Sequence, residues 1–69
     1  MITFKFAERF KELRLEMQLN QTETAKLFGV TQPTIAKWER GDLVPPTKLF
    51  MRIAVEFKTS MDYLAGLTD

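Results

Sequence analysis

The polar side chains best placed to recognise a ligand lie in one stretch, Gln21 to Arg40. Two short helical patterns in this stretch meet at Phe28-Gly29-Val30, with the small Ala25 four positions before the glycine and the β-branched Ile35 six positions after it. This spacing is typical of two helices that cross at a steep angle, the second of which can lie in the major groove of DNA. Since Ile35 and Trp38 face inward, the positions of the second helix that face outward are Gln32, Pro33, Ala36, Lys37 and Arg40.

Five helical patterns joined by short connections account for nearly the whole chain and predict an all-α fold, in a single domain over residues 1–69. The first pattern runs from Thr3, a candidate N-cap, to Met17. Its apolar residues recur at spacings of 4, 3 and 4, which places one apolar stripe on one helical face. The residues of this stripe are Phe6, Phe10, Leu13 and Met17.

The second predicted helix spans Gln21 to Phe28 and has recognisable signals at both ends. Asn20 can cap its start, with Glu23 three residues later as the partner in a capping box. Gly29 can end it, because a left-handed C-cap needs a residue without a side chain.

The third predicted helix spans Gln32 to Arg40, between the candidate N-cap Thr31 and the terminating Gly41. Pro33 is tolerated there because an N–H in the first turn has no intrahelical partner, although proline disfavours helical geometry at the residue before it.

Two further helices complete the prediction. The fourth spans Thr47 to Phe57 after a stiff connection and carries a wide apolar face, made of Leu49, Phe50, Ile53, Ala54 and Phe57. The fifth spans Met61 to Ala65, with Ser60 as its N-cap and Gly66 at its end.

Composition excludes several classes of protein. The 69 residues contain no cysteine and no histidine, so neither a disulfide framework nor a Cys or His metal site is expected, and no cofactor is implied. No signal peptide and no segment of about 20 apolar residues is visible, so a cytoplasmic protein without membrane contact is expected. The net charge of +1 gives only weak support for nucleic-acid binding.

The chain resembles the lambdoid-repressor-like helix-turn-helix family, also called the XRE or Cro/C1 type, over nearly its whole length. The combination of Gly-Val-Thr-Gln, Trp-Glu-Arg-Gly and a late Ser-x-Asp-Tyr-Leu at these separations is highly specific. The residues that carry the resemblance are Leu13-Arg14, Gln21, Ala25, Phe28 to Gln32, Thr34-Ile35, Trp38 to Gly41, Pro45 and Ser60 to Leu64. It implies a compact five-helix DNA-binding domain with its helix-turn-helix unit at 21–40 and its third helix in the major groove.

The resemblance also assigns roles to single residues. The expected contacts to bases are Gln32, Pro33 and Lys37, and the expected contacts to the DNA backbone are Gln21, Thr31, Thr34 and Arg40. Gln21 is also expected to brace Gln32. The chemistry agrees, because glutamine can pair with adenine N6 and N7 and lysine can donate to guanine O6 and N7. Arg14 and Glu39 are expected to form a partly buried ion pair that ties the first helix to the third.

Three departures from the family pattern affect these expectations. Thr24 stands where the family usually has a buried aliphatic residue, and Leu27 stands where a polar one is common. The connection 42–44 is often basic in the family, so fewer phosphate contacts are expected there. Ala36 offers no hydrogen bond to a base, which leaves readout to Gln32 and Lys37.

The function expected from these features is that of a sequence-specific double-stranded DNA-binding transcriptional regulator of repressor type, from a bacterium or a phage. One helix reads few base pairs, so a homodimer on a palindromic operator is expected. The candidate dimer contacts are Leu43, Val44, Leu64 and Leu67. The chain is expected to be either a complete minimal regulator or an excised DNA-binding domain.

Other functions remain open to different degrees. An antitoxin-like or regulator-binding module that uses the same fold to hold a protein partner is the main alternative, and the near-neutral charge favours it. An enzyme has no support in the sequence. A small-molecule site is not expected either, because the helical spacing of the six phenylalanines is typical of a core. Glu8, Glu12 and Glu16 predict an acidic, solvated stripe that faces away from DNA.

Overall fold

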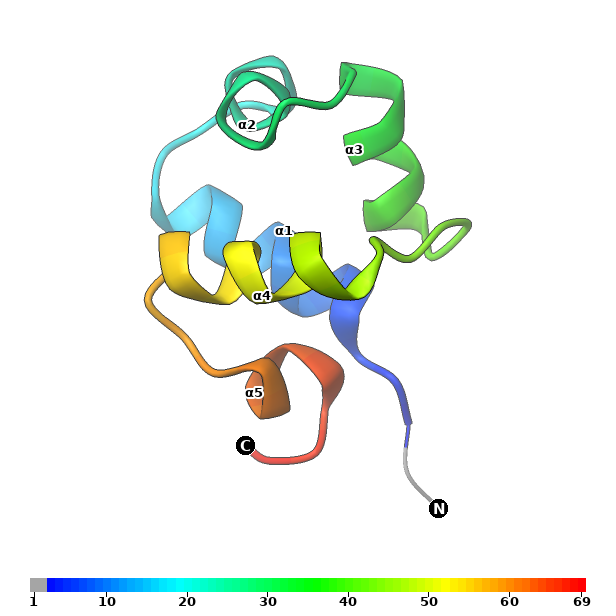
Figure 1. The fold of residues 1–69 in the computed structure, drawn as a ribbon, viewed down its shortest axis with the longest axis vertical. Helices are drawn as coiled ribbons and strands as arrows, with labels where there is room; N and C mark the ends of the chain where they lie inside the picture. Colours follow the sequence, from blue (N-terminus) through cyan, green and yellow to red (C-terminus); the bar gives the residue numbers. More distant parts are fainter. Residues whose placement is uncertain (1–2) are drawn as a thin grey trace.

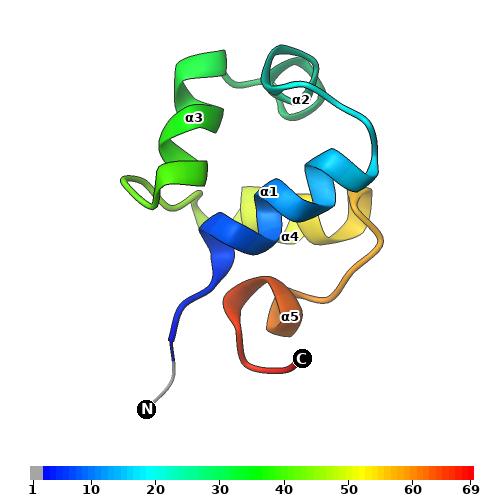
Figure 2. The same ribbon diagram turned by 180° about the vertical axis from the view of Figure 1, so that it is seen from behind.

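The computed structural model describes residues 3–69, and in this range the chain forms five helices and no strand. The helices are α1 (Phe6–Glu16), α2 (Gln21–Phe28), α3 (Gln32–Arg40), α4 (Thr47–Glu56) and α5 (Met61–Ala65). α1 and α4 cross the middle of the molecule, with α2 and α3 on one side of them and α5 on the other (Figures 1 and 2). The predicted all-α, five-helix fold is confirmed.

The start of α1 differs from the prediction. The helix begins at Phe6, after an N-cap Lys5 whose side chain makes no capping hydrogen bond, and Thr3 is not a cap. The backbone N–H of Lys5 instead donates to the carbonyl of Ala65, 3.1 Å away. A Cβ on Gly66 would lie 2.6 Å from the carbonyl oxygen of Thr3, and Gly66 has φ +93°. The segment before α1 is therefore held against the end of α5 by its backbone.

The predicted apolar stripe of α1 is wrong at its last residue, Met17. Phe6 and Phe10 are buried and Leu13 packs against the core, but Met17 is 47% exposed. The helix ends one residue earlier than predicted, and Gln18 then takes a positive φ of 59°. The chain turns away at this point, so Met17 does not continue the buried face.

The turn between α2 and α3 forms as predicted. The Asn20 side chain accepts from the Glu23 N–H at 2.7 Å, and the Glu23 carboxylate accepts from the Asn20 N–H at 2.9 Å, which completes the capping box. Gly29 has φ +68°, a left-handed conformation that ends α2 and costs glycine no steric clash. The Thr31 side chain caps the next helix, accepting from the Thr34 N–H.

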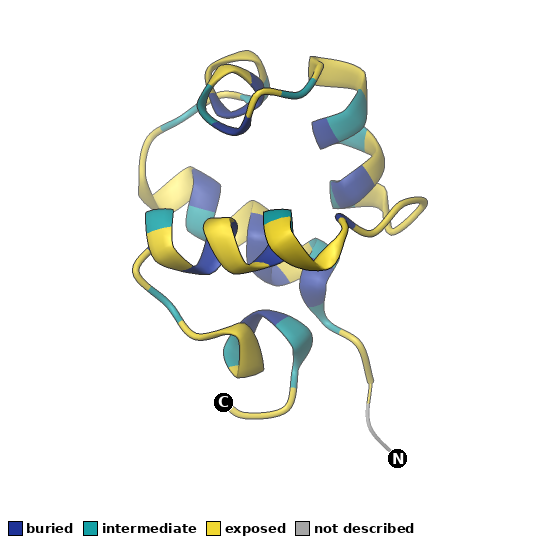
Figure 3. Cartoon of the chain, viewed as in Figure 1, coloured by how far each residue is buried: buried dark blue, intermediate teal, exposed yellow. Residues whose placement is uncertain are grey.

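The core is an aromatic cluster centred on Phe10. The centroid of its ring lies 5.3 Å from that of Phe6 and 5.5 Å from those of both Trp38 and Phe57. Residues buried in this way face the centre of the molecule from several helices, as the dark blue segments in Figure 3 show. Phe4 is the exception among the phenylalanines, because it is 53% exposed.

Thr24 keeps the buried position that an aliphatic residue usually fills in the family. It is fully buried, and its hydroxyl donates to the carbonyl of Asn20 at 2.8 Å. This bond satisfies the hydroxyl, so its burial leaves no unpaired polar group. Leu27 is only partly buried, yet it packs against the same core.

We expect Phe10→Ala to lower the free energy of unfolding by about 3–5 kcal/mol, because it removes the ring on which the aromatic cluster is centred. Urea unfolding followed by Trp38 fluorescence measures this change. Phe4→Ala is the matched control, since its ring is half exposed, and its cost should be well under half as large. Equal losses in the two variants would contradict the assignment of Phe10 to the centre of the core.

Candidate nucleic-acid interface

α3 has one face buried in the core and one face exposed to solvent. Ile35 and Trp38 are 0% and 1% exposed, so they fix the inward face of the helix. Gln32, Pro33 and Lys37, the residues predicted to contact bases, are all exposed. Pro33 lies in the first turn and does not delay the start of the helix at Gln32.

Gln32 is held in place by Gln21 at the start of α2. The Gln32 Nε2 donates to the Oε1 of Gln21 at 2.7 Å, and the Nε2 of Gln21 donates in turn to the Oε1 of Glu39 at 3.1 Å. A residue expected to read a base and a residue expected to contact the DNA backbone are therefore joined directly. One N–H of each amide remains free for another acceptor.

Glu39 is the partner of Arg14 on α1. The Arg14 Nε lies 2.5 Å from one Glu39 carboxylate oxygen and its Nη2 lies 3.0 Å from the other, a bidentate geometry. The side chains are only 8% and 5% exposed. The Nη1 of Arg14 also donates to the carbonyl of Leu19 at 2.8 Å. We refer to the linked side chains of Arg14, Glu39, Gln21 and Gln32 as the polar relay.

Three other residues are expected to contact the DNA backbone, namely Thr31, Thr34 and Arg40. The hydroxyls of Thr31 and Thr34 lie 2.9 Å apart at the start of α3. Arg40, at the end of the same helix, is paired with Asp42, whose Oδ2 lies 3.0 Å from the Arg40 Nε. Both side chains of this pair are 59% exposed, so Arg40 stays accessible, although an acid already engages part of its guanidinium.

Arg9 has a role that the sequence did not indicate. It is buried, and its Nη1 donates to the carbonyls of Tyr63 and Thr68 at 2.5 and 2.6 Å. Its guanidinium also lies over the Tyr63 ring, 4.2 Å from the centroid. These partners are 54 and 59 positions away in the sequence, and backbone carbonyls leave no signal in residue types. Arg9 ties α1 to the C-terminal segment and is not available to a ligand.

The surface predicted for dimerisation needs one correction. Leu64 is fully buried, because α5 packs its inner face against α1 and α4. Leu43, Val44 and Leu67 are 45%, 51% and 59% exposed. The acidic residues of α1 that were predicted to form a solvated stripe, Glu8, Glu12 and Glu16, are exposed.

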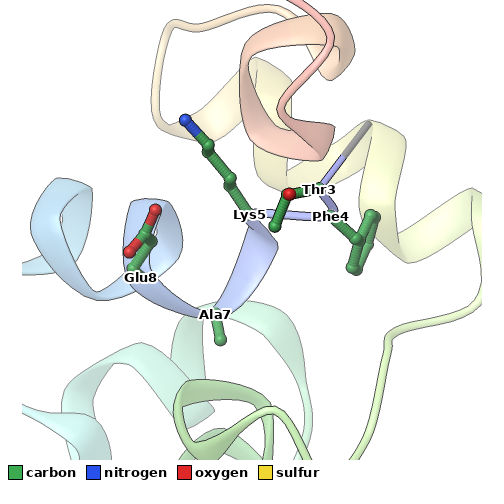
Figure 4. Close-up of a pocket in the computed structure, with 5 residues that line it drawn as sticks. All are labelled: Thr3, Phe4, Lys5, Ala7 and Glu8. Atoms are coloured by element: carbon green, nitrogen blue, oxygen red, sulfur yellow. The ribbon is translucent and has the colours of Figure 1, made fainter. Parts of the chain in front are cut away.

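A surface hollow of about 180 Å³ lies at the start of α1 (Figure 4). It is lined by Thr3, Phe4, Lys5, Ala7 and Glu8. Within residues 3–69 no group of three or more Asp, Glu, Cys or His side chains could hold a metal ion. Over the same range, none of the helices has both the length and the apolar character needed to span a bilayer.

The matches to known proteins agree with this geometry. A family model described as helix-turn-helix matches residues 10–64. An uncharacterised HTH-type transcriptional regulator of Bacillus subtilis, YgzD, is 35% identical over 54 residues, which cover 78% of this chain and 82% of that protein.

Solved structures extend the similarity to the whole fold. A transcriptional regulator from Listeria innocua matches with a TM-score of 0.90 and 31% identity, over 99% of this chain but only 64% of its own. The P22 c2 repressor, crystallised with a synthetic operator, matches with a TM-score of 0.81 and 27% identity, over 90% of this chain and 94% of its own.

The same fold also occurs as part of a larger enzyme. The hydroxypropylphosphonic acid epoxidase of S. wedmorenis matches with a TM-score of 0.78 and 32% identity, over 93% of this chain but only 34% of the epoxidase. The likeness therefore covers about a third of that enzyme. From the family match, the relative and the lambda-repressor-like fold, the chain belongs to the XRE or Cro/C1-type helix-turn-helix family of DNA-binding transcriptional regulators.

Proposed function

We propose that this protein is a sequence-specific repressor that binds a palindromic DNA operator as a homodimer and reads the major groove with α3. The observation that carries the proposal is the exposed start of α3, where Gln32 is braced by Gln21 while Ile35 and Trp38 hold the helix on the core. A recognition helix needs this combination, because base contacts discriminate only when the side chains are held in register with the groove. The P22 c2 repressor, a structural neighbour, was crystallised with an operator, which supports the same use of the fold here.

Base readout is assigned to Gln32, Pro33 and Lys37. The free N–H and carbonyl of the Gln32 amide match the N7 acceptor and the N6 donor of adenine. The exposed ammonium of Lys37 suits the two acceptors of guanine. Pro33 offers an apolar surface to a thymine methyl group. Because Ala36 contributes no hydrogen bond, each α3 helix reads few base pairs.

Contacts to the DNA backbone are assigned to Gln21, Thr31, Thr34 and Arg40. They surround the start and the end of α3, so together they would fix its position and orientation without adding sequence information. The remaining N–H of Gln21 and the threonine hydroxyls suit phosphate oxygens. Arg40 would have to share its guanidinium between Asp42 and a phosphate.

Dimerisation is assigned to the exposed apolar residues that remain after the correction at Leu64, namely Leu43, Val44 and Leu67. A symmetric pair of α3 helices would double the number of bases read. It would also match half-sites about one helical turn apart. The proposal includes no catalytic step. The cytoplasmic location expected from the sequence stays a prediction.

A protein-interaction module on the same fold, such as an antitoxin-like protein, is the second candidate. Two observations favour it: the net charge of only +1, and an apolar hollow of about 130 Å³. Exposed Phe4, Leu43 and Val44 border this hollow, and Phe6 and Trp38 contribute to its lining. Only the repressor function requires DNA binding, so a DNA-binding measurement separates the two candidates.

Selection of bound duplexes from a random pool is expected to enrich a palindrome with two half-sites about one helical turn apart. On the selected duplex, log K should fall linearly with log salt concentration, with a slope of about −0.9 for each phosphate neutralised. Fluorescence anisotropy at several salt concentrations measures the slope. No enrichment from the pool, or a flat salt response on every duplex, would contradict DNA binding and favour the interaction module.

Replacement of Gln32 by alanine should weaken binding to the selected operator by about 1–3 kcal/mol and remove the preference at one base position in each half-site. Binding to a set of single-base operator variants measures both effects. Lys11→Ala is the control, because Lys11 is exposed on α1 outside the proposed contact set, and it should leave the base preference unchanged. If Gln32→Ala weakens all duplexes equally, Gln32 does not read a base.

A further inference from the structure

The polar relay contains one group that can only accept hydrogen bonds, the carboxylate of Glu39. A carboxylate beside a guanidinium has no proton to give, so whatever Gln21 presents to it must be a donor. The Gln21 amide therefore turns its NH₂ toward Glu39, where the separation is 3.1 Å, and its carbonyl toward Gln32. The orientation of the first amide follows from the chemistry of its neighbour.

The orientation of the second amide follows in the same way. A carbonyl oxygen also only accepts, so Gln32 has to present its NH₂ to Gln21, over the observed 2.7 Å. One N–H of Gln32 is used in this bond. The group that remains outward is one N–H beside one carbonyl oxygen, a donor next to an acceptor.

This donor–acceptor pair distinguishes the two purines. Adenine offers an acceptor at N7 and a donor at N6, which match it, whereas guanine offers acceptors at both N7 and O6. A glutamine that reads guanine well would need both of its N–H groups, and one of those of Gln32 is already committed. The relay thus favours adenine over guanine at the base that faces Gln32.

We propose that Glu39 is a positioning residue that sets the base preference of Gln32 by fixing the direction of the amide of Gln21. Its side chain is only 5% exposed, so it acts through the relay and not by touching DNA. This inference rests on the proposed function, because it concerns the base that Gln32 reads. It gives Glu39 a second role besides its pairing with Arg14, which holds α1 to α3.

Glu39→Gln tests the inference, because an amide at position 39 can donate to Gln21 as well as accept from it. Gln21 can then turn over and donate to the carbonyl of Gln32, which frees both N–H groups of Gln32 for guanine. The measurement is the ratio of dissociation constants for two operators that differ only by A·T or G·C at the position located by Gln32→Ala. The wild type should prefer adenine by about 5- to 150-fold, and the ratio for Glu39→Gln should fall to near one.

Arg14→Gln is the matched control. It breaks the same buried ion pair, but the amide at position 14 can still donate to the carboxylate of Glu39, so the relay keeps its direction and the wild-type ratio is expected. A purely structural role for Glu39 predicts the same ratio in both variants, because both lose the same contact. Equal ratios, whether both are high or both near one, would overturn the inference.

If Glu39→Gln or Arg14→Gln does not give a native circular dichroism spectrum, Gln21→Met tests the inference in its place. It interrupts the relay between Glu39 and Gln32 and leaves the ion pair with Arg14 intact, so the ratio should again approach one. A wild-type ratio in Gln21→Met would overturn the inference while the proposed function stands. Failure of the wild type to bind any duplex would overturn the inference and the proposed function together.

Discussion

The packing of Trp38 against Phe10 is the constraint on which the rest of the structure depends. The two rings meet edge to face, with centroids 5.5 Å apart and planes at 87°, and both are almost wholly buried. α3 has only nine residues, too few to be a stable helix alone, so both its helical form and its rotation depend on this contact. Because Trp38 faces inward, Gln32 and Lys37 have to face outward. The core thereby decides which side chains a base could meet.

Several basic side chains of the sequence are bonded to other parts of the fold and do not form a basic surface. Arg9 and Arg14 are both buried on α1, and their guanidinium groups are used by carbonyls and a carboxylate. Arg52 donates to the carbonyl of Leu27 at 2.6 Å and so ties α4 to α2. The proposed interface therefore depends on Lys37, Arg40 and uncharged hydrogen-bonding groups more than on a basic patch. Under the proposed function, the base preference at Gln32 then depends on the orientation of its amide, which the polar relay would set.

The parts of the fold that sequence predicted are those specified locally. The capping box at Asn20 and the left-handed Gly29 depend on residues within one turn, so their signals lie side by side in the chain. The start of α1 and the burial of Arg9 could not be predicted, because their partners are backbone carbonyls at the far end of the chain. The burial of Leu64 was missed for a related reason: a five-residue helix is too short for a period that shows its inner face. The roles assigned to the recognition residues stay predictions.

The bonds of Arg9 have a consequence for the cooperativity of the domain. A helix as short as α5 would fray if it stood alone. Its release from α1 would expose Leu64 and break the hydrogen bonds that Arg9 donates to the carbonyls of Tyr63 and Thr68. Local opening of α5 therefore costs more than its length alone would suggest. The tertiary contacts of α1 with the C-terminal segment thus stabilise a helix that its own five residues could not.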